Sequence, residues 1–210
     1  MRETLYELGE EEILNRLKIF MPPGQIDDDT ADIDPLNKKL LINTDILVEN
    51  IHFSEETTSP RDVGWKAVSS NFSDLACSGV EEIIGITIGM VALPNTQWHW
   101  VNEVYKGIED ALNVYGGNLL GGDCSTGQQK ILAITAIGRA GELRLHRSNA
   151  MPGDLLVASG SHGLSRLGLA LLQFDPCLEK YSLTEELKQA AIKSHKRPKP
   201  ALKALKIQKE

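Results

Sequence analysis

Apolar residues recur along this chain at two alternating spacings, one typical of helices and the other of buried strands. An apolar stripe at three- and four-residue steps predicts a helix over residues 98–117, which Gly116 and Gly117 end. Pro60 and Gly79 bound a second predicted helix. The same analysis predicts three more helices, over residues 5–20, 162–174 and 183–195.

Runs rich in Leu, Ile and Val separate these helices and predict strands. The runs cover residues 38–53, 83–93, 118–123, 130–140 and 155–160. Strands that alternate with helices predict an α/β fold, an α+β sheet with helices packed on it. We place a domain boundary near residues 149–153, which divides the chain into residues 1–148 and 149–210. The second part begins another α/β unit and then becomes a basic tail, so we interpret it as an incomplete domain.

The charge balance narrows the class of partner. The 210 residues include 29 Asp and Glu against 22 Lys and Arg, a formal net charge of −7. A nucleic-acid-binding surface needs a basic face over the phosphates, so this balance argues against one. It leaves a nucleotide enzyme open, because acidic clusters bind Mg²⁺ and Mg²⁺ binds phosphate.

Cysteine usage and the N-terminus indicate a compartment. Cys77, Cys124 and Cys177 lie far apart and form no C-x-x-C pair, which suits a reducing compartment and argues against structural zinc. The N-terminal segment is acidic and lacks the long apolar stretch of a signal peptide. No apolar run approaches the roughly 18 residues of a membrane span. We therefore expect a cytoplasmic protein with no membrane partner.

Four acidic sites interrupt otherwise ordinary segments. They are the run Asp27-Asp28-Asp29 in the loop over residues 21–35, Asp45 in INTDIL, Asp74 in NFSDLACSG and Asp123 in LLGGDCSTG. Taken singly, the run is explained by solvation or helix capping, Asp74 by an exposed helix surface and Asp123 by a turn. Asp45 is different, because it interrupts an apolar strand and a buried unpaired carboxylate is very costly. A bound metal ion would remove that cost.

These residue types favour one class of cofactor. Aspartates with Thr or Asn neighbours and no His or Cys partner suit a hard cation, and Mg²⁺ usually bridges such oxygens to substrate phosphates. The glycines before Asp123 allow the backbone to approach a phosphate closely. The chain has neither a G-x-x-x-x-G-K-[ST] phosphate loop nor a strand–GxGxxG–helix unit. This excludes a P-loop enzyme and argues against a Rossmann dinucleotide site.

Two residues outside the acidic sites are further candidates. Arg147 in LHRSNAMPGD could clamp a phosphate with two parallel hydrogen bonds, although its spacing alone favours an ordinary surface arginine. His52 in VENIHF lies on a predicted strand, where a histidine is more often a satisfied core or edge residue than a catalyst. No Ser/His/Asp or Cys/His grouping indicates a nucleophile, so we assign no catalytic residue.

Four segments, in this order and spacing, resemble the thiamine-monophosphate kinase family. They are INTDILVENIHF, WKAVSSNFSDLACSGV, LLGGDCSTG and LHRSNAMPGD, and the resemblance runs from the first helix to RPKP. The family shares its fold with aminoimidazole ribonucleotide synthetase and selenophosphate synthetase. It transfers the γ-phosphate of ATP directly onto the phosphate of thiamine monophosphate, which gives thiamine diphosphate.

The resemblance implies a role for each candidate residue. The implied metal ligands are Asp29, Asn43, Thr44, Asp45, Asp74 and Asp123; the ATP contacts are Gly122, Asp123 and Arg147; and the contact to thiamine monophosphate is His52. It also implies several Mg²⁺ ions and a homodimer formed through the N-terminal sheets. Phosphoryl transfer needs positioning and charge neutralisation more than a covalent nucleophile. The acceptor phosphate is already ionised at neutral pH, so no general base is required.

The chain departs from the family pattern in three places. Asp27 stands where the family loop has Gly, and Asn43 stands where the family has Ser or Thr. Family members also continue past this length and carry a later Ser-Asp-Gly motif, which supplies a metal ligand and phosphate contacts. An alternative function follows, that of a truncated and inactive member acting as a nucleotide-binding or dimerising module. A sister enzyme of the same fold is a third alternative, although the VENIHF histidine argues against selenophosphate synthesis.

Overall fold

The computed structural model describes residues 3–23, 39–142, 146–158 and 160–202. The helices and strands, in chain order, are α1 (Leu5–Leu17), η1 (Lys18–Phe20), β1 (Leu40–Val48), α2 (Pro60–Cys77), β2 (Val80–Ala92), α3 (Trp98–Tyr115), β3 (Asn118–Thr126), β4 (Ile131–Ala140), η2 (Arg147–Asn149), α4 (Leu164–Leu172), η3 (Pro176–Leu178) and α5 (Glu185–Lys196). The α/β fold predicted from the sequence is thereby confirmed.

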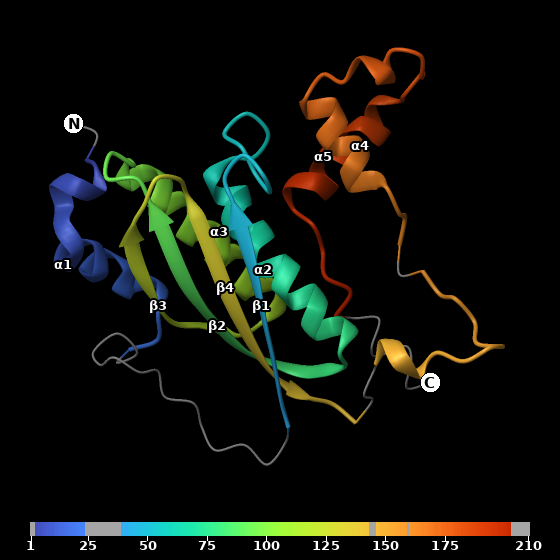
Figure 1. The fold of residues 1–210 in the computed structure, drawn as a ribbon, viewed down its shortest axis with the longest axis horizontal. Coiled ribbons are helices and arrows are strands. Elements are labelled where there is room, and N and C mark those ends of the chain that lie inside the picture. Colours follow the sequence, from blue (N-terminus) through green and yellow to red (C-terminus); the bar gives the residue numbers. More distant parts are fainter. Residues whose placement is uncertain (1–2, 24–38, 143–145, 159, 203–210) are drawn as a thin grey trace.

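The four strands form one sheet in the order β1-β4-β2-β3 (Figure 1). Strands β1 and β2 both run antiparallel to β4, whereas β2 and β3 are parallel. A parallel pair cannot be joined by a tight turn, and helix α3 supplies the crossover between them. This order places β1 and β3 at opposite edges of the sheet, and both strands carry predicted site residues.

Helices α2 and α3 cover one face of the sheet and enclose the core (Figure 1). Along β4, Leu132, Ile134 and Ala136 are fully buried against these helices, and the residues between them are half-buried. The apolar stripe of α3 lies in the same layer, with Val101 and Val104 fully buried. Burial of these side chains is the main favourable term in folding this layer.

Two glycines allow α2 and α3 to pack closely together. A Cβ atom on Gly107 of α3 would lie 1.8 Å from the Arg61 carbonyl oxygen, and one on Gly64 of α2 would lie 2.0 Å from the Val104 carbonyl oxygen. Any side chain at either position would push the two helices apart. Since α2 carries predicted site residues, this close packing helps to fix their position.

Among the described residues, no helix covers the other face of the sheet (Figure 1). Exposed and helix-facing residues alternate along β1. Ile42 is 62% exposed and Ile46 is 52% exposed. Between them Thr44 shares a hydrogen bond of 2.8 Å with the hydroxyl of Thr135 on β4. We call the surface formed by these four residues the open face.

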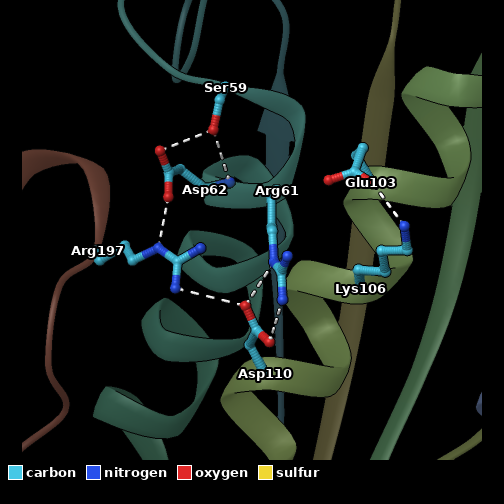
Figure 2. A network of polar contacts seen from close by, with 7 residues as sticks. All are labelled: Ser59, Arg61, Asp62, Glu103, Lys106, Asp110 and Arg197. Atoms are coloured by element: carbon cyan, nitrogen blue, oxygen red, sulfur yellow. Dashed lines mark hydrogen bonds and ion pairs between the residues drawn. The ribbon is translucent and has the colours of Figure 1, made fainter.

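The last two described helices, α4 and α5, pack against each other away from the sheet (Figure 1). The chain returns to the helical layer just after α5, at Arg197. Its Nε atom donates to Asp62 of α2 at 2.5 Å, and its Nη1 atom donates to Asp110 of α3 at 3.4 Å (Figure 2). Trp65 of α2 donates from Nε1 to the Pro198 carbonyl oxygen at 2.8 Å. These contacts attach the C-terminal helices to the sheet domain.

The strand predicted over residues 155–160 is wrong for the described part of that segment, and the strand predicted over residues 38–53 ends at Val48, which leaves His52 in a turn. Residues 155–158, expected to begin a strand, form no ladder, and Leu155, Leu156 and Val157 are exposed. A strand needs a neighbour to satisfy its backbone groups, and none of the described strands lies beside this segment. The division into domains at residues 148 and 149 stays a prediction. None of the described helices is long and apolar enough to cross a membrane.

Candidate functional site

Asn43, Asp45 and Asp74 meet where strand β1 packs on helix α2. Asn43 and Asp45 lie on the helix-facing side of β1, because they are two residues apart in a strand. The Asn43 side chain donates from Nδ2 to Oδ2 of Asp74 at 3.4 Å. Three of the predicted metal ligands therefore come together, from one strand and one helix. We call Asn43, Asp45, Asn71 and Asp74 the acidic cluster.

Asn71 holds this cluster together. Its side chain is fully buried, and its Oδ1 atom accepts from Asn43 Nδ2 at 3.0 Å and from the Asp45 backbone N–H at 3.1 Å. Its own Nδ2 donates to the Ala67 carbonyl oxygen at 2.9 Å. A buried amide whose nitrogen and oxygen are both hydrogen-bonded has a fixed orientation, because exchanging the two atoms would break these bonds and leave desolvated polar groups.

Asn71 was missed by the sequence analysis. Its signal was nevertheless present in NFSDLACSG, where Asn71 and Asp74 are three residues apart. Residues at this spacing are neighbours on a helix surface. The amide was overlooked because a polar residue in a helix is explained equally well by exposure to solvent.

The acidic cluster concentrates negative charge. Burial, and next the negative charge of Asp74, raise the pKa of Asp45, while the nearby His52 lowers it. The Asn43 Oδ1 atom is buried and accepts no hydrogen bond from the described part of the chain. Carboxylate and amide oxygens left in this state are suited to a hard cation such as Mg²⁺. A cation there would reduce the repulsion between Asp45 and Asp74 and would give the Asn43 Oδ1 atom a partner.

Two carboxylates alone make a partial metal site. In the ranges that the structure describes, no three His, Cys, Asp or Glu side chains gather where they could hold a metal ion. Asp29, the ligand predicted from the early loop, lies outside the described residues, as do Asp27 and Asp28. Mg²⁺ commonly completes its coordination with water and substrate phosphate, so few protein ligands are needed.

Thr44 lies apart from this cluster, although it was predicted as a ligand beside Asp45. Adjacent residues of a strand point to opposite faces. The Thr44 side chain accordingly lies on the open face, where it hydrogen-bonds Thr135. The structure thus brings Asn43 and Asp45 together with Asp74 but leaves the Thr44 hydroxyl on the other side of the sheet.

Gly122 and Asp123 lie on β3, at the opposite edge of the sheet. Two strands separate β3 from β1, which corresponds to about 14 Å across the sheet. Both residues are exposed, and a Cβ atom on Gly122 would lie 2.1 Å from the Ile88 carbonyl oxygen. The close approach explains the glycine structurally. Within one chain, Asp123 does not share a site with Asp45.

His52 and Arg147 were the two remaining candidates. His52 is exposed in the turn that follows β1, and the Val48 backbone N–H donates to its Nδ1 atom at 3.0 Å. Its effect on the pKa of Asp45 places it within electrostatic reach of the acidic cluster. Arg147 begins the short helix η2, and its side chain lies outside the described part of the chain.

Comparison with known proteins identifies the family. Residues 27–140, more than half of the chain, match the family described as AIR synthase related protein, N-terminal domain. The chain belongs to this family. It is also similar to the thiamine-monophosphate kinase of Prochlorococcus marinus, with 60% identity over 97% of this chain and 61% of that protein.

Two solved structures of thiamine monophosphate kinase are similar in fold to this chain. The crystal structure of thiamine monophosphate kinase from Aquifex aeolicus matches 87% of this chain and 59% of that chain, with a TM-score of 0.73 and 31% identity. AaThiL complexed with AMPPCP and TMP gives the same TM-score and identity over 98% of this chain and 64% of that chain. The resemblance predicted from the four segments is confirmed. The chain spans about three fifths of the length of these relatives.

Proposed function

We propose that this chain binds ATP and thiamine monophosphate and transfers the γ-phosphoryl group of ATP to the substrate phosphate with the help of Mg²⁺, giving thiamine diphosphate. The observation that carries the proposal is the acidic cluster, in which Asp45 and Asp74 repel each other and Asn43 Oδ1 lacks a donor. The similarity to kinases, one of them complexed with AMPPCP and TMP, supports the choice of substrates.

The residues of the acidic cluster fit Mg²⁺, whose positive charge would balance the carboxylates. Asp45, Asp74 and the Asn43 amide oxygen would hold one ion, and the resemblance implies Asp29, Thr44 and Asp123 as ligands among the several ions. Mg²⁺, when bound, neutralises phosphate charge and so lets two polyanions approach each other. Several ions would serve this purpose better than one, because the donor and the acceptor both carry phosphate.

The chain's own groups position the two substrates. Gly122, Asp123 and Arg147 are proposed to contact ATP, and His52 to contact the thiamine substrate. Alignment of the acceptor oxygen with the γ-phosphorus is the main requirement of such a transfer. The acceptor phosphate needs no deprotonation at neutral pH, so no described residue has to act as a general base.

The direct test mixes the purified chain with ATP, Mg²⁺ and thiamine monophosphate and measures thiamine diphosphate by chromatography. Asp74→Ala should abolish product, because it removes one carboxylate of the acidic cluster. Glu109→Ala is the matched control, since Glu109 is an exposed acid on α3 far from the cluster in sequence. Product that survives Asp74→Ala unchanged would overturn the assignment of the site.

The alternative function is a module that binds nucleotide and dimerises without turnover. The family loop that this chain resembles has Gly where Asp27 stands, and this difference motivates the alternative. Mg²⁺-dependent binding of ATP without formation of thiamine diphosphate would support this alternative. Absence of both binding and product would contradict the two functions together.

A homodimer is proposed through the open face. The exposed Ile42 and Ile46 present apolar surface on a sheet that no described helix covers on that side. A second copy packed on this face would bury them, as two sheets do in a sandwich. Thr44, which lies apart from the acidic cluster of its own chain, would then lie close to the second copy.

A further inference from the structure

The turn that carries His52 is closed by backbone hydrogen bonds. The backbone N–H groups of Ile51 and His52 both donate to the Val48 carbonyl oxygen, at 3.1 and 2.9 Å, and the Asn50 N–H donates to the Phe53 carbonyl oxygen at 2.7 Å. Asn50 has a φ of 64°, a left-handed conformation that asparagine tolerates. Phe53 is buried and fixes the far end of the turn. The backbone around His52 is therefore well defined.

The hydrogen bond to the imidazole selects one tautomer. The Val48 backbone N–H can only donate, so the Nδ1 atom that it contacts at 3.0 Å must carry a lone pair. In the neutral ring the proton then lies on Nε2. His52 is exposed, and Nε2–H makes no hydrogen bond within the described residues. The ring therefore offers a donor to a ligand.

Lys66 of α2 reaches this turn from the helical layer. Its Nζ atom donates to the His52 carbonyl oxygen at 2.7 Å. The side chain is half-buried, and burial lowers the pKa of the ammonium group. No carboxylate within the described ranges pairs with it. Its one strong interaction is thus a charge-assisted hydrogen bond to the backbone of the residue that presents the donor.

We propose that Lys66 is a positioning residue that holds the His52 turn so that the imidazole presents its Nε2–H to an acceptor atom of the thiamine substrate. The identity of that substrate rests on the proposed function, whereas the positioning itself rests on the two hydrogen bonds described above. Helix α2 carries both Lys66 and Asp74. One rigid element therefore sets the separation between the substrate-binding turn and the acidic cluster.

The first test needs no substrate. Hydrogen exchange of the Val48 amide reports whether the His52 ring still accepts its hydrogen bond. Lys66→Met keeps the length of the side chain and removes the donor, and it should speed exchange of this amide by roughly ten-fold. Lys66→Arg should restore exchange to the wild-type rate. Lys106→Met is the matched control, because Lys106 pairs with Glu103 on α3 and should leave Val48 unchanged.

The second test measures binding of thiamine monophosphate and of AMPPCP by calorimetry. Lys66→Met should weaken the binding of thiamine monophosphate by roughly ten-fold and leave the binding of AMPPCP unchanged. His52→Gln should have the same two effects. The double variant should bind no more weakly than His52→Gln alone, because Lys66 acts through His52. Additive losses in the double variant, or equal losses for both ligands, would overturn the positioning role.

The two tests separate this inference from the proposed function. If the wild-type chain binds no thiamine monophosphate, the substrate assignment fails, and the exchange rate of Val48 still decides the role of Lys66. Faster exchange in Lys66→Met, with a circular-dichroism spectrum like that of the wild type, supports the role. Wild-type exchange in that variant overturns it.

Discussion

The buried Asn71 side chain accepts a hydrogen bond from the Asn43 side chain at 3.0 Å, and this contact joins helix α2 to strand β1 at the acidic cluster. The same Oδ1 atom accepts the Asp45 backbone N–H. One neutral residue therefore sets the distance between the carboxylates of two different elements. The cluster is consequently a property of the packed fold as well as of its acidic residues.

Asn71→Ala should destabilise the protein by about 2–3 kcal/mol, because it removes the acceptor of the Asp45 backbone N–H, the nearer of the two acceptors of Asn43 Nδ2, and a donor to the Ala67 carbonyl oxygen. Urea denaturation monitored by circular dichroism measures the change. Asn113→Ala is the control, since Asn113 is exposed on α3 and should change stability by less than about 0.5 kcal/mol. Equal effects of the two substitutions would contradict the role given to Asn71.

Asp45 should make stability depend on pH. Its pKa in the folded protein is raised above the ordinary value of 3.8, chiefly by burial and then by Asp74. The folded state therefore binds the proton more tightly than the unfolded state. The stability that this contributes is fully present below the unfolded pKa and is lost as pH rises through the folded pKa.

The effect of Asp45→Asn follows from this direction of the pH dependence. Without divalent cations at neutral pH, the variant should have a higher Tm than the wild type, and the difference should shrink as the pH falls through the ordinary carboxyl range. Mg²⁺ should raise the Tm of the wild type more than that of the variant. Thermal unfolding in EDTA and in Mg²⁺ measures both effects, with Glu109→Gln as the control. Parallel pH curves for wild type and Asp45→Asn would rule out the raised pKa.

Arg197→Met should loosen the attachment of the C-terminal helices (Figure 2). The guanidinium group pairs with Asp62 and Asp110 and lies 5.2 Å from the Trp65 ring centroid. These groups are partly exposed, so after allowance for solvent screening we expect a loss of about 1 kcal/mol.

Limited proteolysis measures that loosening, because cleavage between η2 and α4 should become faster while the sheet stays folded. Arg166→Met provides a comparison, since Arg166 is an exposed arginine of α4. High salt should increase cleavage of the wild type but have a smaller effect on Arg197→Met. Identical cleavage of the wild type and both variants would show that the contacts do not restrain the segment.

Ile46→Lys tests the open face as a dimer interface. A charge there should weaken dimerisation by roughly 30-fold or more, because it would be buried against apolar surface of the second copy. Light scattering coupled to size-exclusion chromatography gives the mass of each form. Ile51→Lys is the control, since Ile51 is 73% exposed in the turn outside the sheet. A monomeric wild type, or a dimeric Ile46→Lys variant, would contradict this interface.

Much of the fold could be predicted from the sequence because periodicity reports burial. The stripe of α3 and the buried alternation along β4 follow directly from apolar spacing. Asp45 was singled out for the same reason, since a carboxylate inside an apolar strand needs compensation. The segment at residues 155–158 was assigned wrongly because strand composition does not supply a neighbouring strand.

The arrangement of the site depends on topology, which spacing along the chain does not determine. The resemblance implies that Asp123 and Asp45 both bind metal, but the order of the strands places β3 and β1 at opposite edges. Alternation within β1 moves Thr44 to the open face. Asn71 was overlooked because a neutral amide gains importance only from its burial between Asn43 and Asp45.

Calorimetric titration of AMPPCP, with and without Mg²⁺, tests most directly whether the acidic cluster holds a metal–nucleotide complex. The wild type and an Asp45→Asn, Asp74→Asn double variant would be compared, and turnover is not needed. We predict binding to the wild type that requires Mg²⁺, and binding to the double variant that is at least roughly ten-fold weaker. Equal affinity of the two proteins in Mg²⁺, or wild-type binding that is unchanged without it, would contradict a Mg²⁺–phosphate role for this cluster.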